Sequence, residues 1–525
     1  MIKSLLLAVS IVAHEPGYYT SLANHVQRWL RNENVPAQVV TPKTMSAALA
    51  KERLAFLVGF ATPAPAEMQA LRAFRARGGK FVVFHSSAPA LAELMGVKPL
   101  GYISAPYPGA WSRMDFIAGR PAGFPAAIRQ TSTVLQSAVP LKGKGRVLAT
   151  WSDRNGRSTG KAAWIETAAG WWMTHVLLAD GDEKLKARLV SAMVGAADPK
   201  AWSLAASEAR AKRTADSLRA YAQRQVPRAG EIHAVWDHSG CGLYPGDWLK
   251  TMKVLSAAHV TDLFVNVAGA GFAHYPSSVL PRSKTYADEG DQLAKCVQAG
   301  RACGVRVHAW ILCFNATRTS PEQLESFRKR GWRLRTKDGR VTDYLDPSNP
   351  IIRGRILAAV DEIVANYRVD GIHLDFVRWY EGAAKPKNAA SVITAFVSEV
   401  RRHVKRPTLL STAVLGKYPA CVGSVGQDWP RWAEANLVDY VVPMDYTESN
   451  ELFTSYVAQH AASRVVASKT IAGLGVTANE SRLNARDVID QVRIVRQYGL
   501  AGEALFDLDV TLETDILPYL RMGLW

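Results

Sequence analysis

The sequence predicts an α/β protein of two domains, a Rossmann-like domain followed by a (β/α)8 barrel. Three observations lead to this prediction. The 525 residues, 48% of them hydrophobic, suffice for two or three packed cores. Short apolar runs alternate with helix-length segments in both halves, which is typical of parallel sheets. A basic helical stretch at 204–230 separates these halves. We therefore expect domains at 1–203 and 231–525, joined by a linker.

Apolar runs rich in Val, Leu and Phe alternate with helical patterns in the first domain. One helix is followed by Gly78 and Gly79, a stop signal, and then by the apolar run KFVVF. Two later runs, RVLATW and GWWMTHVLL, are expected to complete the sheet. The expected strands are 5–12, 56–60 and 80–84, and the expected helices are 22–33 and 66–77.

The apolar run LLLAVSIVA (Leu5–Ala13) is too short to span a bilayer and is interpreted as the first strand. Because Lys3 precedes it and a small residue ends it, the run also fits a minimal export signal, which stays open as the alternative.

The segment FLVGFATPAPAEMQALRAFRARGGKFVVFHSS resembles the class I glutamine-amidotransferase-like superfamily, in particular its ThuA-like and beta-galactosidase-trimerisation-like branches. Amidotransferases of this class carry a nucleophilic thiol on the turn after such a strand. Here that turn reads His85-Ser86-Ser87, and no cysteine precedes Cys241. Amidotransferase chemistry is therefore excluded, and the missing GxSxG elbow disfavours a serine hydrolase. The resemblance implies an accessory domain and a candidate surface for oligomer contacts.

The net charge of +18 is concentrated in the first part of the chain, since residues 1–230 hold 30 Lys and Arg against 14 Asp and Glu. We interpret this excess as a solvated surface together with the basic connector at 207–228. Binding of an anionic polymer stays open as the alternative. We expect no nucleic-acid partner.

The cysteines do not indicate a metal site. All five follow residue 240, and none lies in a CxxC pair or at zinc-like spacing to a histidine. We expect no metal and no cofactor. The cysteines are Cys241, Cys296, Cys303, Cys313 and Cys421.

The second domain contains eight apolar strand-like runs separated by helix-length segments rather than by hairpin turns, so consecutive strands should be parallel. The expected strands are Ile232–Trp236, Asp262–Val267, Val305–Leu312, Gly371–Asp375, Leu409–Val414, Tyr440–Asp445, Val465–Ala472 and Ala501–Asp507. In such a barrel the chemistry lies at the carboxyl ends of the strands, and alternation along each strand predicts which side chains face the lumen.

On the fourth strand Gly371, His373 and Asp375 share one face, while the apolar Ile372 and Leu374 share the other. The apolar pair suits packing against helices. We therefore expect His373 and Asp375 to face the lumen, with Asp375 at the mouth.

The same reasoning gives two further candidate carboxylates. On the sixth strand it turns Val441, Pro443 and Asp445 inward, with Asp445 at the mouth. On the eighth strand it places Glu503, Leu505 and Asp507 on one face. Asp507 is then uppermost, and Glu503 lies deep and needs a partner such as Arg306.

Two carboxylates at one mouth indicate glycoside cleavage. The oxocarbenium-like transition state needs one carboxylate to attack or stabilise the anomeric carbon and one carboxylic acid to protonate the leaving oxygen. We expect Asp375 to be the nucleophile and Asp445 the general acid/base of a retaining hydrolase. The alternative is that these carboxylates cap loops or pair with Arg378.

Residue types usual in sugar sites surround the carboxylates. Aromatic faces stack on the C–H faces of sugars, whereas Asn, His and Asp bond their hydroxyl groups. The candidate substrate-binding residues are Trp236, Asp237, His238, Asn266, His308, Trp310, His373, Arg378, Trp379, Tyr446 and Asp507.

The barrel half resembles the glycosyl-hydrolase-like family 10 proteins of bacteria through HAVWDHSG, FVNVAGAGFAHYPSSVLP, GVRVHAWILCFN, YLDPSNPIIRGRIL, YRVDGIHLDFVRWYE and VDYVVPMDYT. These motifs cover nearly all of 231–510 in order. The resemblance implies a TIM-barrel glycosidase relative of unassigned sugar specificity, and it favours an extracytoplasmic location. A nucleophile on strand four with an acid/base on strand six is also the arrangement of the alpha-galactosidase clan.

Chitinase-type barrels carry DxxDxDxE on the fourth strand. Here Asp370, His373, Asp375 and Val377 occupy the four positions, so the catalytic glutamate of that motif is missing. Substrate-assisted hydrolysis of that type is therefore disfavoured.

Three functions remain open from the sequence. The first is a glycoside hydrolase acting on an oligo- or polysaccharide, and the basic first domain would suit an acidic glycan. The second is a barrel that binds glycans without cleaving them. The third is an anionic-polymer binder acting through the first domain.

Overall fold

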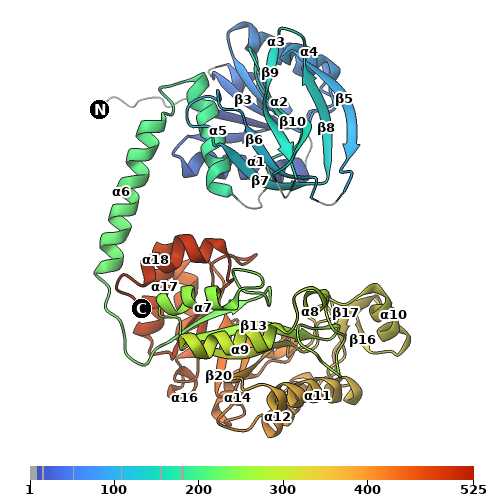
Figure 1. The fold of residues 1–525 in the computed structure, drawn as a ribbon, viewed down its shortest axis with the longest axis vertical. Coiled ribbons are helices and arrows are strands. Elements are labelled where there is room, and N and C mark those ends of the chain that lie inside the picture. Colours follow the sequence, from blue (N-terminus) through green and yellow to red (C-terminus); the bar gives the residue numbers. More distant parts are fainter. Residues whose placement is uncertain (1–8, 15–16, 51, 108, 154–155, 179–181) are drawn as a thin grey trace. The chain divides into compact units, whose positions relative to one another are not determined.

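The computed structural model divides into two units, Met1–Thr214 and Ala215–Trp525, which we describe separately (Figure 1). The division falls within the long helix α6 (Leu204–Gln223), which coincides with much of the basic stretch. The residues described by the structure are 9–14, 17–50, 52–107, 109–153, 156–178 and 182–525.

The N-terminal unit is built on a nine-stranded sheet in the order β2-β1-β3-β4-β11-β10-β9-β6-β7. The first five strands of this order are parallel and the other four are antiparallel. Their bounds are β1 Val9–Ala13, β2 Ala37–Val40, β3 Leu54–Val58, β4 Lys80–Phe84, β6 Trp111–Phe116, β7 Ala127–Ser132, β9 Gly145–Ser152, β10 Ser158–Thr167 and β11 Gly170–Met173.

Helices cover both faces of this sheet. Alternate residues of each parallel strand enter two separate cores, so that Phe56 packs on one face and Leu57 on the other. Helices α1 (Tyr18–Asn32) and α5 (Glu183–Ala197) close the first core. Helices α2, α3 and α4 close the second; their bounds are Pro42–Leu49, Pro65–Ala76 and Pro89–Met95. The predicted Rossmann-like class is confirmed.

Details of the N-terminal prediction differ from the structure. The strand at Lys80–Phe84 is as expected, whereas the one before it begins two residues early, at Leu54. The two runs expected to complete the sheet form β9 and β11, but β6 and β7 continue the sheet beyond them, and β5 (Val97–Ser104) pairs separately with β8 (Val134–Pro140). Residues 5–8 of the predicted first strand, and of the export-signal alternative, lie outside the described residues.

The C-terminal unit is a closed barrel of eight parallel strands, which confirms the predicted (β/α)8 class. The strands follow in sequence order, and β12 closes the barrel by pairing with both β13 and β22. Their bounds are β12 Ile232–Asp237, β13 Asp262–Gly269, β15 Arg306–Leu312, β18 Gly371–Asp375, β19 Leu409–Leu415, β20 Tyr440–Met444, β21 Ile471–Gly475 and β22 Gly502–Phe506. A two-residue strand, β14 (Phe272–Ala273), adds to β13.

The seventh strand was predicted wrongly at Val465–Ala472. The apolar residues Val466 and Ala467 lie instead in the short helix α16 (Arg464–Ala467), and the strand begins at Ile471. A short apolar run does not distinguish a buried helical turn from a strand, and the prediction merged the two.

Helices surround the barrel on the outside (Figure 1). Their apolar faces meet the outward residues of the strands in one large core, whereas a smaller core fills the lumen. The helices are α7 Trp248–Ala257, α8 Lys284–Glu289, α9 Gln292–Cys303, α10 Pro321–Lys329, α11 Pro350–Asn366, α12 Ala389–His403, α13 Ala420–Val425, α14 Trp429–Glu434, α15 Asn450–His460, α17 Ala485–Gln497 and α18 Leu517–Leu520, with a π-helical turn at Leu512–Ile516 and a hairpin β16–β17 at Arg333–Arg335 and Val341–Leu345.

The predicted inward face is correct for the fourth strand and wrong for the sixth and eighth. Ile372 and Leu374 pack in the outer core, as expected. On β20, however, Val442 fills the lumen and Val441 packs outside; on β22, Leu505 likewise packs outside. Adjacent apolar residues on these two strands made both registers equally plausible, and a shift of one residue reverses every side chain.

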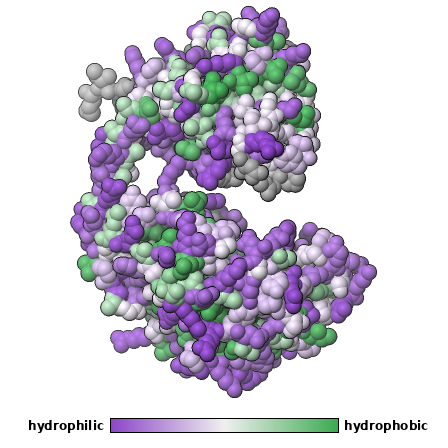
Figure 2. Space-filling view, viewed as in Figure 1, coloured by the Kyte–Doolittle hydropathy of each residue, from purple (hydrophilic) through white to green (hydrophobic). Residues whose placement is uncertain are grey.

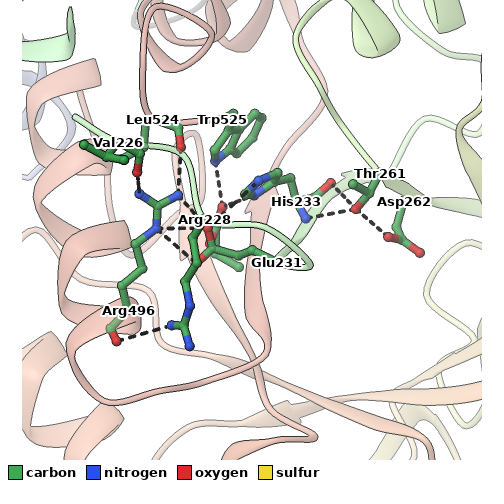
Figure 3. A network of polar contacts seen from close by, with 10 residues as sticks. Val226, Arg228, Glu231, His233, Thr261, Asp262, Arg496, Leu524 and Trp525 are labelled. Atoms are coloured by element: carbon green, nitrogen blue, oxygen red, sulfur yellow. Dashed lines mark hydrogen bonds and ion pairs between the residues drawn. The ribbon is translucent and has the colours of Figure 1, made fainter. Parts of the chain in front are cut away.

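The seam between the first and last barrel strands is held by a buried polar network at their amino-terminal ends (Figure 3). Arg496 makes a bidentate ion pair with Glu231 and bonds the carbonyl of Leu524 at 2.7 Å. Glu503 accepts bonds from His233 Nδ1 at 2.8 Å and from the indole of Trp525 at 2.7 Å.

The partner predicted for Glu503 was wrong, as this network between the first and last strands (the seam network) shows. We expected Arg306 to pair with it inside the barrel. Arg306 bonds Asp262 instead, and Glu503 lies on the outer side of β22 against His233. The misassigned face of the eighth strand accounts for this difference.

Hydrophilic residues cover most of the visible surface of each unit, and hydrophobic residues form small groups among them (Figure 2). Within the described residues, no helix is both long and apolar enough to cross a membrane.

Candidate active site at the barrel mouth

Strand register places the candidate side chains in layers along the lumen. Asn266, Trp310 and His373 lie side by side on β13, β15 and β18, and Asp375 lies beside Leu312 two residues further toward the carboxyl end. Because all eight strands point the same way, that end is the mouth. The fourth-strand prediction for Asp375 therefore agrees with its place in the barrel.

Asp375 is 5% exposed, and only one of its two carboxylate oxygens accepts hydrogen bonds. Its Oδ1 accepts the backbone N–H of Phe376 at 2.5 Å and a guanidinium N–H of Arg378 at 3.3 Å. No hydrogen bond of full geometry reaches its Oδ2 from the described residues. Burial raises the pKa of Asp375 above its ordinary value, while the charge of Arg378 and the nearby indole of Trp310 act to lower it. The site thus holds a partly desolvated carboxylate with one free oxygen.

Phe376 and Arg378 fix the turn that follows the strand. Phe376 has φ of 50°, a left-handed conformation that a bulky residue rarely adopts. The guanidinium of Arg378 lies 4.1 Å from the centre of the Phe376 ring while it bonds Asp375. The predicted alternative, in which Arg378 pairs with Asp375, is therefore part of the structure.

Asp507 directly follows β22. It is the second carboxylate of the mouth in which only one oxygen accepts hydrogen bonds. Its Oδ1 accepts the backbone N–H groups of His238 at 3.0 Å and Leu508 at 2.7 Å, and its Oδ2 accepts none from the described residues. Burial raises the pKa of Asp507 to about 7, and the nearby charge of Asp237 adds to this. At neutral pH this side chain is therefore close to half protonated.

Electrostatic and ring contacts place Asp375 and Asp507 around one aromatic cluster. Burial raises the pKa of Tyr446, and so do the charges of Asp375 and Asp507 and then those of Glu480 and Asp445, so several carboxylates act on the same phenol. The Tyr446 ring stacks on Phe506 with centroids 5.6 Å apart and meets Trp236 edge-on at 6.4 Å. An aromatic floor with two free carboxylate oxygens is an arrangement suited to a sugar ring.

Asp445 lies in a different environment from the one the sequence predicts. It is 0% exposed, and both of its oxygens lie 3.0 Å from Nε2 of His460 on α15, itself fully buried. Burial raises the pKa of Asp445, and His460 acts to lower it. The reversed face of β20 explains this position, because an outward residue meets the helix layer. The acid/base role of Asp445 stays a prediction.

Trp236 and His373 form a bonded pair in the lumen below Asp375. The indole N–H of Trp236 donates to His373 Nε2 at 2.9 Å, and Nδ1 of the same imidazole lies 2.8 Å from the hydroxyl of Ser411. Because an indole only donates, Nε2 is the unprotonated nitrogen and Nδ1 carries the proton. Burial lowers the pKa of His373 well below its ordinary value, so the ring is neutral.

Some of the other predicted binding residues lie at the mouth or in the lumen, and others make contacts elsewhere. Trp310 and His238 belong to the first group. Trp310 faces the lumen beside His373, and its indole acts to lower the pKa of Asp375 although its N–H has no partner at hydrogen-bond geometry. His238 is exposed at the mouth, 5.9 Å from Trp310 between ring centres.

Three predicted binding residues are engaged elsewhere. The buried carboxylate of Asp237 accepts N–H groups of its own loop, at Ser239, Gly240 and Gly242. His308 lies near the amino-terminal end of β15, with Nε2 2.8 Å from Asp262. Trp379 packs in the outer core and donates to the carbonyl of Ala389. Asp237 and Trp379 thus support loops near the mouth, whereas His308 supports the opposite end of the barrel.

Sequence reasoning missed Arg318, which follows β15 on a loop. Its guanidinium bonds the carbonyl of His238 at 3.3 Å and Oδ1 of Asn266 at 3.5 Å, and so lies at the mouth. A loop residue lies outside any period-two pattern. The only sequence signal was its position a few residues after the end of the third strand.

One group in the described part of the chain could offer three ligand atoms to a metal: Glu231, His233 and Glu503, within 4.8 Å of one another. This group belongs to the seam, at the opposite end of the strands from Asp375. Arg496 already pairs with Glu231, and a guanidinium beside the ligands opposes a cation. The seam network is thus better explained as a structural ion-pair network.

Comparison with known families gives one match within the barrel. Residues 247–392 match the family Glycosyl hydrolase-like 10. This segment runs from α7 past β18 and includes Asp375, so the resemblance predicted from the strand motifs is confirmed over this range. No protein with a curated description matches the chain.

Three solved structures are similar to parts of the chain. Alpha-L-fucosidase isoenzyme 2 from Paenibacillus thiaminolyticus is 13% identical, with 56% of this chain and 48% of that chain covered and a TM-score of 0.42. A Group II chitinase catalytic domain from Ostrinia furnacalis is 12% identical, covering 56% and 95%, with a TM-score of 0.38. A putative ThuA-like protein from Bacteroides uniformis is 12% identical, covering 38% and 96%, with a TM-score of 0.31.

The chain spans about half the length of the fucosidase that it matches. Similarities at this distance carry no information about substrate or catalytic residues in this chain. The chemistry must therefore be argued from the side chains of the mouth.

Proposed function

We propose that the barrel, which carries the Glycosyl hydrolase-like 10 match, is a glycoside hydrolase with Asp375 as its nucleophile. One observation carries the proposal: Asp375 ends β18 at the mouth with its Oδ1 held by Phe376 and Arg378 and its Oδ2 free. A held carboxylate with one free oxygen is what attack on an anomeric carbon needs. Arg378 helps to keep it ionised.

We assign the proton donor to Asp507, which was predicted from the sequence only as a third candidate. A general acid works best when its pKa lies near the working pH, and burial raises the pKa of Asp507 to about 7. Its free Oδ2 can protonate the leaving oxygen, while Oδ1 stays bound to backbone N–H groups. Asp445, the original assignment, would have to leave His460 before it could reach a substrate.

In the reaction, the free oxygen of Asp375 attacks the anomeric carbon as the proton of Asp507 passes to the departing oxygen. Water then displaces Asp375, with Asp507 taking a proton from it. Two displacements retain the anomeric configuration, so the first product of each cleavage should have the configuration of the substrate. Proton NMR of the first product checks this.

The test compares Asp375→Asn, Asp507→Asn and Asp445→Asn on a panel of polysaccharides and aryl glycosides. Asp375→Asn should abolish turnover of every substrate and leave the thermal unfolding midpoint nearly unchanged. Asp507→Asn should lose most activity on polysaccharides but keep it on aryl glycosides whose leaving group needs no protonation. Asp338→Asn, an exposed loop variant, serves as the matched control.

The outcomes separate the assignments. If Asp445→Asn shows the leaving-group dependence and Asp507→Asn does not, Asp445 is the acid and our assignment of Asp507 is wrong. If Asp375→Asn retains turnover, the proposed nucleophile is wrong.

A glycan-binding barrel without catalysis is the second candidate. The burial of Asp445 against His460 favours it, because it removes one of the carboxylates predicted for the mouth. This candidate requires saturable glycan binding with no turnover of any panel member. Binding of anionic polymers by the basic N-terminal unit remains a further prediction, which salt-dependent binding would test.

A further inference from the structure

Arg318 is a mouth arginine without an acidic partner. No ion pair joins it to a carboxylate anywhere in the described chain. Its two hydrogen bonds go to neutral oxygens, the carbonyl of His238 and the amide oxygen of Asn266, and its guanidinium lies 4.6 Å from the centre of the Phe272 ring. Arg378, in contrast, is paired with Asp375. The charge of Asp237 acts on Arg318 without an ion pair between them, so Arg318 brings to the mouth a positive charge that pairs with no carboxylate of the described residues.

The groups nearest Arg318 do not neutralise it. Burial lowers the pKa of His238, and the charge of Arg318 lowers it further. Burial lowers the pKa of His274 to about 4, again with Arg318 contributing. Both imidazoles are thus mainly neutral at pH 7. Burial acts to lower the pKa of Arg318 and the charge of Asp237 acts to raise it, while the side chain stays exposed to solvent.

Asn266 adds a second, independent sign of a missing acceptor. It is 0% exposed, and its amide nitrogen has no hydrogen-bond partner. Because Arg318 bonds its oxygen, the two N–H donors of the amide point elsewhere. His274 Nε2 is likewise buried without a partner, and its Nδ1 lies 2.7 Å from the hydroxyl of Ser283. A buried polar group without a partner is unfavourable until a ligand or water meets it.

We infer that Arg318 and Asn266 form a subsite for an oxyanion on the glycan, either a carboxylate or a sulfate group. A guanidinium offers such a group two parallel N–H donors, and Asn266, whose oxygen Arg318 bonds, has further N–H donors without a partner. The inference rests on the proposed function for the location of the subsite. Asp375 and Arg318 both shift the pKa of His238, so the oxyanion would lie close to the point of cleavage.

The structure also explains why this subsite would select charge. The guanidinium of Arg318 bonds only neutral oxygens, so a carboxylate or sulfate would give it an opposite charge that a neutral hydroxyl cannot supply. The net charge of the ligand, more than its ring stereochemistry, should therefore decide binding here. The structure assigns to Arg318 the role of a specificity-determining residue.

The experiment measures binding to the Asp375→Asn protein, so that turnover does not interfere. The probes are carboxylated and sulfated polysaccharides, each compared with its carboxyl-reduced or desulfated counterpart. Arg318→Gln and Arg318→Lys are introduced into this background. Arg301→Gln is the matched control, because Arg301 is also exposed and bonds a backbone carbonyl, that of Arg368, on the outside of the barrel.

We expect at least one charged polysaccharide to bind more tightly than its neutral counterpart. Arg318→Gln should weaken that binding about 10- to 100-fold, the effect of losing charge-assisted hydrogen bonds, and leave the neutral counterpart within about threefold. Arg318→Lys should restore part of the loss, and rising salt should reduce the difference. Arg301→Gln should change nothing. Which probe binds distinguishes carboxylate from sulfate.

Three results would overturn the inference: no charged probe binds, charged and neutral members bind equally, or Arg318→Gln weakens both equally with an unchanged thermal midpoint. Turnover by the unmodified protein is measured on the same panel. Charge-selective binding without turnover would refute the hydrolase proposal and keep the subsite. Turnover without charge preference would refute the subsite and keep the hydrolase.

Discussion

Replacing Asp507 by Asn should make the protein more stable and less active at alkaline pH. In the folded protein burial raises the pKa of this carboxyl from 3.8 to about 7. The unfolded chain loses the proton near 3.8, so the folded state binds it more tightly, and stability falls as pH rises from about 4 to 7. The full difference corresponds to roughly 4 kcal/mol above pH 7, at about 1.4 kcal/mol for each tenfold change in proton affinity.

Asparagine removes this penalty because it carries no charge, and its side-chain oxygen can still accept the N–H groups of His238 and Leu508. We expect the free energy of unfolding at pH 8 to rise by about 2–4 kcal/mol relative to the unmodified protein. At pH 4 the two proteins should differ by less than about 0.5 kcal/mol. Urea unfolding at both pH values measures the two differences.

The same pKa of Asp507 should determine where the activity begins to fall as the pH rises, which is the alkaline limb of the pH–activity profile. If protonated Asp507 is the acid, kcat/KM on a polysaccharide should fall about tenfold per pH unit above pH 7. The Asp507→Asn protein should lose this limb together with most of its activity. The reasoning would be refuted by an alkaline limb that persists in the variant, or by a gain in stability over the unmodified protein that is no larger at pH 8 than at pH 4.

Two stability predictions concern groups below and beside the mouth. Asp445→Ala leaves the buried His460 without its partner and should lower the free energy of unfolding by about 3–5 kcal/mol in urea titrations; a loss below about 1 kcal/mol would contradict a buried pair. Trp236→Phe keeps an aromatic ring but removes the N–H donated to His373 Nε2, and should cost about 1–3 kcal/mol by the same measurement. An unchanged midpoint would show that His373 finds another donor.

The barrel could be predicted because its signals are local. Eight apolar runs separated by helix-length pieces leave few other folds, and the fourth strand could be oriented because His373 and Asp375 alternate with Ile372 and Leu374. The sixth strand lacks such contrast. Val441 and Val442 are equally apolar, so its register was decided only by contacts with distant residues.

The site was predicted in part for the same reason. Asp375 could be assigned because alternation and strand end coincide at one residue. Asp507 was predicted only as a further candidate and Arg318 was missed, because both follow their strands on loops, where side-chain direction depends on the local turn. The burial of Asp445 depends on His460, 15 residues away on another element. The alternation of residues within the sixth strand therefore could not predict the contact of Asp445 with His460.

The seam network has a consequence for how the chain matures on the ribosome. Strand β12 leaves the exit tunnel long before β22, yet Glu503 on β22 bonds His233 on β12 and also Trp525, which follows β22. The barrel therefore cannot close until β22 and Trp525 have left the tunnel. Until then the nascent barrel has two unpaired edges, which makes it a natural client for chaperones.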